Sequence, residues 1–393
     1  MPDGLDFPIL SVKVRTEAIP VQSAHQQTEG APLQGGCAMS TMMTVDQGKL
    51  DAFVGKAIED FGAAVSSALV VIGDKLGLYR ALAGAGPLTP AELAARTDTS
   101  EQYVHPWLVN QAAGGYVSYD PASGRYSLPP EQAVALTDET SPYCVLGGFQ
   151  VLTSAMKAEP RIAAAFRTGA GLAWGEHDPG LFEGTERFFR PGYAANLAAS
   201  WIPALDGAEG KLRAGATVAD VGCGHGISTI IMAEAYPNSR FFGFDNHAPS
   251  IARARELAAE AGLAGRVVFE VASATDFPGS NYDLIAYFDC LHDMGDPVGA
   301  ARHARAALKA DGHALLVEPM AGERDDDNFN PVGRIYSAAS VLVCTPNALA
   351  TGGTALGTIA TEQALRETLL AGGFTRFRRA TETPFNRIFE ARP

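Results

Sequence analysis

The sequence lacks long apolar runs, closely spaced cysteines and an excess of basic residues. No apolar run approaches the roughly 18 residues that span a bilayer, and no basic start is followed by an apolar core. We therefore expect neither a membrane span nor a signal peptide. The five cysteines, at positions 37, 144, 223, 290 and 344, form no CxxC pair. This pattern indicates neither a disulfide framework nor a zinc site, and it favours a cytoplasmic protein.

Basic residues are outnumbered: 30 Lys and Arg stand against 44 Asp and Glu, which gives a net charge of −14. The phosphates of a nucleic acid need a basic face, so this balance argues against a nucleic-acid partner, although a local patch could be hidden in the average. Hydrophobic residues make up 47% of the 393 residues. That is enough apolar material for two or three globular domains.

The first 45 residues lack periodicity and mix Pro, Gln, Gly and Ser, which predicts a disordered tail. Met42 and Met43 stand just before the first helical pattern, so a later start of translation is an alternative. From residue 45 to 82, apolar residues recur at helical spacing, which predicts one or two amphipathic helices.

Residues 46–135 have the order helix, turn, helix, hairpin, which indicates a winged-helix module. Thr89 is placed to cap a helix, with Pro90 in its first position and Glu92 three residues after the cap. The second helix, 100–111, contains no Lys or Arg, which a recognition helix normally uses for phosphate and guanine contacts. We therefore interpret the module as a dimerisation and substrate-capping domain of a homodimer.

Residues 136–205 are rich in Ala and are expected to be helical, as a linker and cleft wall. Most aromatic residues there are expected to pack in the core. Ligand pockets form at domain junctions, so three of them are candidates for contacts with a substrate: Trp174, Phe189 and Tyr193.

From residue 206 to the end, strands and helices alternate, which predicts an α/β doubly wound sheet. Expected strands lie at 217–221, 240–244, 267–271, 282–288 and 314–317. Two more, at 375–379 and 386–390, are expected to form a hairpin, so the last strand should be antiparallel. A long insertion at 319–361 interrupts the domain, and loops of this length are often lids.

A glycine loop, Asp220-Val-Gly222-Cys-Gly224-His-Gly226, joins the first of these strands to a helix. Such a loop holds a polar ligand against backbone amides. The dinucleotide fingerprint G-x-G-x-x-G fails, because its third glycine would fall on Ile227 or Thr229. The loop instead resembles motif I of class I S-adenosylmethionine-dependent methyltransferases.

Further pieces of that family's pattern follow in order. Asp245 closes the second strand, where the family's carboxylate accepts hydrogen bonds from both ribose hydroxyls. Ser273 stands where many members have an Asp that reaches the adenine, so a hydroxyl replaces that carboxylate here. The resemblance implies S-adenosylmethionine as cofactor, held by Asp220, Gly222, Gly224, Gly226, Asp245, Asn246, Ser273, Ala274, Thr275 and Asp289.

The loop after the fourth strand holds His292 in the pattern L-H-D-x-x-D, at the carboxyl edge of the sheet where doubly wound folds bind ligands. The pattern is similar to that of winged-helix small-molecule O-methyltransferases, in which the matching histidine takes the hydroxyl proton. The resemblance gives Glu318 the place of one acid beside this base, whereas the second acid is replaced by Ile359. A loop histidine with a purely structural hydrogen bond is the alternative.

Over residues 46–393 the chain also resembles a bacterial group of winged-helix methyltransferases, which are often labelled regulator-like. The likeness includes N-P-V-G-R at 330–334 and T-P-F-N at 383–386. Arg334 is therefore a candidate to bind an anionic substrate, with a salt bridge inside the lid as the alternative.

Together these features predict a cytoplasmic, S-adenosylmethionine-dependent methyltransferase. We expect direct transfer to a hydroxyl of a small, partly aromatic molecule, without a metal, because no His, Asp and Glu cluster has ligand spacing. Transfer to adenine or an amide nitrogen is disfavoured, because the loop at 289–291 does not resemble [ND]-P-P-[FY]. The alternatives are a transcription regulator with S-adenosylmethionine as effector, and a catalytically silent protein that only binds the cofactor.

Overall fold

The structure is a computed structural model that describes residues 45–393. The predicted tail and the alternative start at Met42 or Met43 lie outside the described residues. The chain divides into two compact units, 1–62 and 63–393, and each is described by itself. The described part of the first unit is the beginning of helix α1 (Gln47–Lys75).

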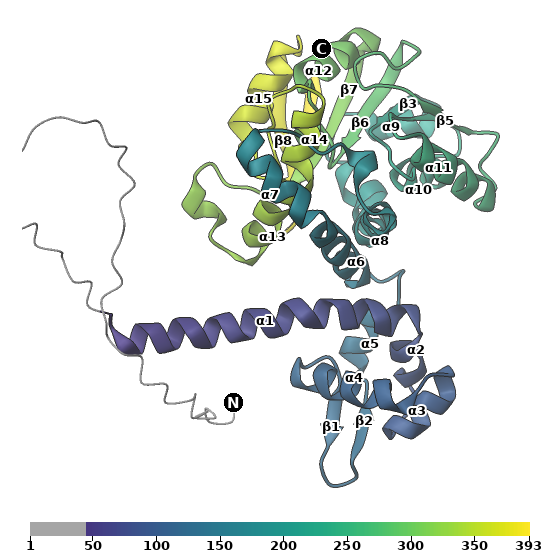
Figure 1. The fold of residues 1–393 in the computed structure, drawn as a ribbon. Helices are drawn as coiled ribbons and strands as arrows, with labels where there is room; N and C mark the ends of the chain where they lie inside the picture. Colours follow the sequence, from purple (N-terminus) through teal and green to yellow (C-terminus); the bar gives the residue numbers. More distant parts are fainter. Residues whose placement is uncertain (1–44) are drawn as a thin grey trace, which may run out of the picture. The chain divides into compact units, whose positions relative to one another are not determined.

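The second unit begins with the predicted winged helix (Figure 1). After α1 come α2 (Leu78–Leu82), α3 (Pro90–Thr97), α4 (Glu101–Ala113), the antiparallel strands β1 (Ser118–Asp120) and β2 (Arg125–Ser127), and α5 (Pro130–Thr137). The predicted capping box is present: Glu92 N donates to Thr89 Oγ1 over 3.2 Å, and Thr89 N donates to the Glu92 carboxylate over 2.8 Å. Tyr79, Trp107 and Leu108 lie in one buried core that links the helices.

The stretch that follows is helical, as expected. It comprises α6 (Leu146–Ala155), η1 (Met156–Ala158), α7 (Glu159–Thr168), η2 (Trp174–Glu176), α8 (Pro179–Asn196), the π-helical turn η3 (Leu197–Trp201) and α9 (Ala208–Ala214). Helices α6 and α8 approach closely at Gly147, where a Cβ atom would lie only 2.3 Å from Phe188 N. This contact fixes the position of α8, whose opposite face lines the site described below.

The final domain is built on a seven-stranded sheet in the order β5-β4-β3-β6-β7-β9-β8, in which β9 is antiparallel to both neighbours. This confirms the predicted fold class. The strands are β3 (Thr217–Val221), β4 (Arg240–Asp245), β5 (Val267–Val271), β6 (Tyr282–Phe288), β7 (Leu308–Pro319), β8 (Arg376–Glu382) and β9 (Asn386–Arg392). Strand β7 is longer than predicted, and its extension to Pro319 includes Glu318.

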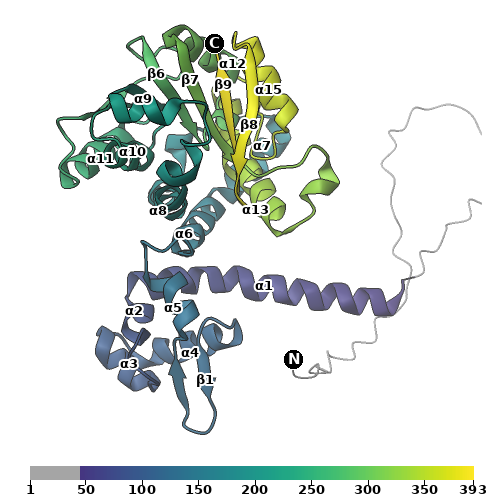
Figure 2. The same cartoon turned by 180° about the vertical axis from the view of Figure 1, so that it is seen from behind.

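Helices cover both faces of the sheet, because side chains along each strand alternate between two cores. In β6, Leu284 and Ala286 pack with α10 (Ile227–Ala235) and α11 (Ala248–Glu260), whereas Ile285 and Tyr287 pack with α12 (Pro297–Ala307) and α15 (Glu362–Ala371). Figure 2 shows the two sets of helices on either side of the strands.

The insertion at 319–361 is largely helical. It contains η5 (Asp325–Asn328), α13 (Pro331–Ala339), the π-helical turn η6 (Ser340–Cys344) and α14 (Thr345–Ala350). Asn330 caps α13, since its Oδ1 accepts a hydrogen bond from Gly333 N over 2.9 Å.

Across residues 45–393, we find no helix with the length and apolar character that crossing a bilayer requires.

Candidate active site

The glycine loop leaves β3 with three residues in the left-handed region: φ is +75° at Gly222, +53° at Gly224 and +74° at Gly226. Only glycine adopts this conformation without strain. Gly222 and Gly224 line a cavity. Gly226 does not line the cavity, and a Cβ atom there would lie 2.3 Å from the Phe269 ring. Of the three glycines predicted to hold the cofactor, Gly226 therefore serves packing.

Asp220 is also set back from the cavity. It is fully buried, and its Oδ2 accepts hydrogen bonds from Ser228 Oγ and Thr229 Oγ1, each over 2.6 Å. Burial raises the pKa of this carboxyl to about 6. Asp220 thus ties the first turn of α10 to β3. These hydrogen bonds hold the two ends of the glycine loop in place.

Asp245 lies at the end of β4 and lines the cavity. Its Oδ2 accepts a hydrogen bond from Gly224 N over 2.9 Å, and its Oδ1 accepts one from His247 N over 2.8 Å. Burial raises the pKa of this carboxyl, and the two backbone amides partly oppose the shift. Each oxygen keeps a further lone pair. The carboxylate is therefore held in place and can still accept two hydrogen bonds from a vicinal diol.

The cavity has a volume of about 390 Å³, within the range of about 300–1,000 Å³ for small-molecule sites. It lies where strand order reverses between β3 and β6, which is the binding position in doubly wound sheets. Eleven of the predicted site residues line it: Gly222, Gly224, Asp245, Asn246, Ser273, Ala274, Thr275, Asp289, Trp174, Phe189 and Tyr193.

Sequence reasoning missed several other lining residues. Two of them, Phe182 and Glu186, share one face of α8 with Phe189 and Tyr193 at helical spacing. That spacing was the signal that could have found them. His225 lies in the glycine loop and Asp293 in the L-H-D-x-x-D pattern, so these patterns could have identified them, whereas no comparable signal marks Met294 and Asn347.

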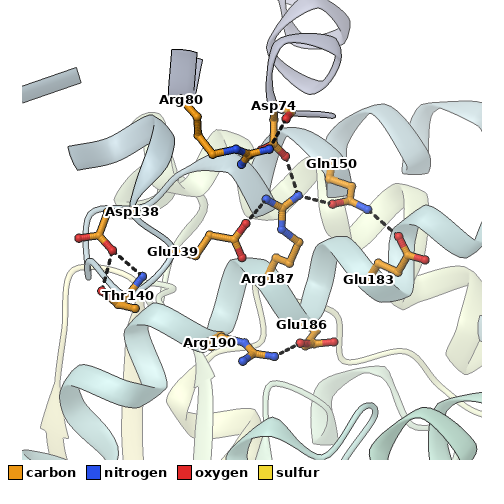
Figure 3. Close-up of polar contacts among 10 residues, drawn as sticks. All are labelled: Asp74, Arg80, Asp138, Glu139, Thr140, Gln150, Glu183, Glu186, Arg187 and Arg190. Carbon is orange, nitrogen blue, oxygen red and sulfur yellow. Dashed lines mark hydrogen bonds and ion pairs between the residues drawn. The ribbon is translucent and has the colours of Figure 1, made fainter. Parts of the chain in front are cut away.

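The opposite face of α8 is fixed by charged contacts (Figure 3). The Arg187 guanidinium donates to Asp74 Oδ2 over 2.9 Å, to Gln150 Oε1 over 2.9 Å and to Glu139 Oε1 over 2.7 Å. Asp74 lies in the last turn of α1 and Glu139 follows α5, so the Arg187 side chain ties α8 to segments at both ends of the winged-helix module. On the cavity side, Glu186 pairs with Arg190 and, over 2.9 Å, with His225 Nδ1 of the glycine loop.

His292 and Glu318 form a buried pair. His292 lies in the short helix η4 (Leu291–Asp293) after β6, and Glu318 lies near the end of the adjacent strand β7. His292 Nδ1 is 2.6 Å from Glu318 Oε2, and the two residues are 2% and 0% exposed. Burial lowers the pKa of the imidazole, but the Glu318 carboxylate raises it, and the net result is a pKa well above its ordinary value.

Neither His292 nor Glu318 lines the cavity, although the next residue, Asp293, does. Cys344 of η6 contacts His292, and ligand atoms of His292, Asp293 and Cys344 lie within 4.8 Å of one another. Besides Glu318, the side chains close to His292 are therefore the Cys344 thiol and the Asp293 carboxyl, and neither comes from the position of the second acid in the sequence pattern. Arg334, on α13, is not among the residues that line the cavity.

Asp289 connects this pair to the cavity wall. Tyr193 Oη donates to its Oδ2 and Asn386 Nδ2 to its Oδ1, each over 2.8 Å. Its φ of +51° is uncommon for a residue other than glycine. Burial and the nearby Glu318 charge raise the pKa of this carboxyl to about 7.

Two family models match the chain, one in each of its two main domains. Residues 212–361 match the family described as "Methyltransferase domain", and residues 63–138 match "Rv2258c-like winged HTH domain". Along the chain, a winged-helix domain therefore precedes a methyltransferase domain. The methyltransferase domain includes the glycine loop, Asp245, His292 and Glu318, and it belongs to the class that uses S-adenosylmethionine.

A curated relative matches about a third of the chain. The chain is 34% identical over 131 residues to 27-O-demethylrifamycin SV methyltransferase of Amycolatopsis mediterranei, which covers 31% of this chain and 48% of the relative. The chain thus spans about half the length of this curated relative.

Solved structures cover much more of the chain. Mitomycin 7-O-methyltransferase has a TM-score of 0.65 at 21% identity and covers 88% of this chain and 100% of its own. Human N-acetylserotonin methyltransferase, in complex with S-adenosylmethionine, has a TM-score of 0.63 at 18% identity and covers 86% and 97%. At these identities the likeness shows the shared fold alone.

Proposed function

We propose that the protein transfers a methyl group from S-adenosylmethionine to a hydroxyl of a small, partly aromatic molecule, with His292 as general base. The observation that carries the proposal is the buried His292–Glu318 pair, which lies directly behind a cavity lined by the glycine loop and Asp245. The related O-methyltransferases named above support the choice of a hydroxyl acceptor.

The cavity residues fit the cofactor. Asp245 presents a fixed carboxylate to a ribose, and Gly224 leaves open space where a Cβ atom would stand. Ser273, Ala274 and Thr275 line the wall after β5 and are assigned to the adenine, while Gly222 and Gly224 are assigned to the methionine end. When bound, S-adenosylmethionine supplies an electrophilic methyl group.

His292 provides the proton acceptor. Imidazole has a pKa of about 6.5 and a phenol one of about 10, so complete proton transfer in advance would cost about 5 kcal/mol. Glu318 accepts from Nδ1 and raises the pKa of His292, which narrows this gap. Nε2 then takes the hydroxyl proton as the new bond forms. Such help is typically worth about 10²–10⁴ in rate.

Access to His292 requires a change in its surroundings. The side chain is 2% exposed and Cys344 lies beside it, so a hydroxyl reaches Nε2 only if the η6 turn gives way. Cys344 belongs to the insertion at 319–361, to which we assign the role of a lid. Trp174, Phe189 and Tyr193 line the cavity and would contact an aromatic acceptor. Arg334 would contact an anionic one only after the lid moves.

The remaining assignments follow from the same division of the chain: 46–135 for dimerisation and capping, 136–205 for the cleft wall, and 206–393 for the chemistry. Helix α1 exposes Phe53, Ile58, Phe61 and Val65, an apolar surface that a second copy of the chain would cover in a homodimer. The four described cysteines are free, which agrees with a cytoplasmic location.

The test is methyl transfer from labelled S-adenosylmethionine to a panel of phenols and hydroxylated metabolites, followed by mass spectrometry of the products. The proposal predicts labelled ethers. A methyl group on nitrogen or carbon would overturn the hydroxyl assignment. A salt-dependent complex with promoter DNA, without any turnover, would favour the regulator alternative.

A further inference from the structure

Three potential metal ligands, His292, Asp293 and Cys344, lie close together beside the cavity. His292 and Asp293 come from η4, and Cys344 comes from η6 in the insertion. One ligand atom from each lies within 4.8 Å of the other two. His292 is 2% and Cys344 7% exposed, whereas Asp293 lines the cavity. Of the three residues, only Asp293 therefore connects the cluster with the cavity.

The ligand types match a zinc-class ion. Thiolate sulfur, imidazole nitrogen and carboxylate oxygen are the three donors that Zn²⁺ uses, and sites with three protein ligands keep a fourth position open. Sulfur among the ligands disfavours Mg²⁺ and Ca²⁺, which prefer oxygen. This set escapes a search for closely spaced ligands in the sequence, because Cys344 is remote from the other two residues.

Glu318 completes the arrangement behind the ligands. It occupies Nδ1 of His292 over 2.6 Å and leaves Nε2 as the free ligand atom. Histidines that bind metals usually donate their other ring N–H to a carboxylate or carbonyl, which fixes the ring and strengthens the bond to the ion. The pair thus has the geometry of a carboxylate–histidine–metal unit.

The local charge also favours a cation. The carboxyl groups of Asp289, Asp293 and Glu318 lie around a single imidazole. The nearby Arg387 directs Nε to the Pro319 carbonyl and Nη2 to the Ala360 carbonyl, so these two donors are committed elsewhere. A divalent ion would offset the negative charge of these carboxylates.

We propose that Cys344 Sγ, His292 Nε2 and the Asp293 carboxylate bind one divalent ion of the zinc class, with the fourth position facing the cavity. Binding releases to solvent the thiol proton of Cys344 and any proton carried by His292 Nε2 or the Asp293 carboxyl, because the deprotonated groups are the ligands. If His292 is the base of the proposed function, the ion takes the lone pair that the base needs. Metal binding and proton transfer then exclude each other.

Cobalt(II) added to the chelator-treated full-length protein tests the site, because a thiolate bound to cobalt gives a near-ultraviolet charge-transfer band. We expect one cobalt per chain and a band that zinc displaces. Cys344→Ser should abolish the band, and Glu318→Gln should weaken binding about 10- to 100-fold by loosening the His292 ring. Cys144→Ser is the matched control, since Cys144 lies in the winged-helix core, and it should keep the band.

Absence of the band in the wild-type protein, or its persistence in Cys344→Ser, would overturn the proposal. Circular dichroism verifies that Cys344→Ser is folded, and Asp293→Asn gives a second variant that should bind cobalt more weakly. The measurement requires no turnover. A failed metal site is therefore distinguishable from a failed methyl-transfer assignment.

Discussion

The two ends of the candidate site are built differently. At the end that we assign to the cofactor, side chains are held by backbone amides close to the ends of β3 and β4, as when Asp245 accepts from Gly224 N and His247 N. At the other end, side chains from distant segments hold one another: His292 with Glu318, and Asp289 with Tyr193 and Asn386. The first end is an open cradle, and the second is a buried polar cluster.

The difference indicates a division of labour. A cradle made from loops beside the strand ends is formed by the sheet itself, so it should bind its ligand without help from the insertion. The buried cluster depends on η4, β7, β9 and the insertion together. Substitutions in the cradle should therefore weaken cofactor binding, whereas substitutions in the buried cluster should lower turnover.

The largest effect is expected for His292→Gln. Gln keeps a polar side chain but cannot accept the proton as imidazole does, so kcat should fall about 10²- to 10⁴-fold. The rate is measured with labelled donor and an acceptor found in the panel. His105→Gln, at an exposed position of α4, is the control and should keep full activity. Unchanged turnover in His292→Gln would remove the base from the mechanism.

Asp245→Ala should act on binding. It removes two charge-assisted hydrogen bonds to the ribose, each worth about 1.5 kcal/mol or more, so affinity for S-adenosylhomocysteine should fall about 100-fold or more. Calorimetric titration measures this change. Asp276→Ala, an exposed residue outside the cavity, should bind as the wild type does. Equal affinities in both variants would contradict the assignment of the cradle.

Glu318→Gln should lower kcat about 10- to 100-fold, because the charged hydrogen bond that orients His292 contributes about 1.5–3 kcal/mol. Glu318 acts through His292, so KM for the donor should stay constant while kcat falls. Steady-state kinetics at varied donor concentration separates the two constants. A rise in the donor KM without a fall in kcat would contradict this positioning role.

The smallest effect distinguishes two glycines within the cradle. Gly224→Ala and Gly226→Ala both strain a positive φ, but only the second places a Cβ atom against the Phe269 ring. Gly226→Ala should therefore lose about 1–3 kcal/mol more stability, measured from urea midpoints. Gly224→Ala should instead weaken binding of S-adenosylhomocysteine. If Gly224→Ala lost more stability and Gly226→Ala lost more affinity, the roles assigned to the two glycines would be wrong.

The geometry at the end that we assign to the cofactor could be predicted from the sequence because its residues are local. A strand, a glycine loop and an acid at the next strand end are a pattern along the chain, and Asp245 and Gly224 indeed meet. The pattern could not distinguish the residues that line the cavity from those that only hold the loop in place. Asp220 and Gly226 belong to the same pattern, yet one bonds to Ser228 and Thr229 and the other packs on Phe269.

The other end was only partly predictable. His292 and Glu318 follow neighbouring strands, so their meeting could be anticipated from the sheet. The position of Cys344 could not, because it depends on how a 43-residue stretch at 319–361 folds into α13, η6 and α14. The Arg187 contacts on α8 were unforeseen for the same reason, since their partners Asp74, Glu139 and Gln150 are remote in sequence.

The separation of the two ends is tested most directly by the affinity of S-adenosylhomocysteine for His292→Gln, Glu318→Gln and Asp245→Ala, measured side by side by calorimetry. The account predicts that the first two variants bind as the wild type does and that only Asp245→Ala loses affinity. A comparable loss in the His292 or Glu318 variant would contradict it, because the buried cluster would then be part of the cofactor cradle.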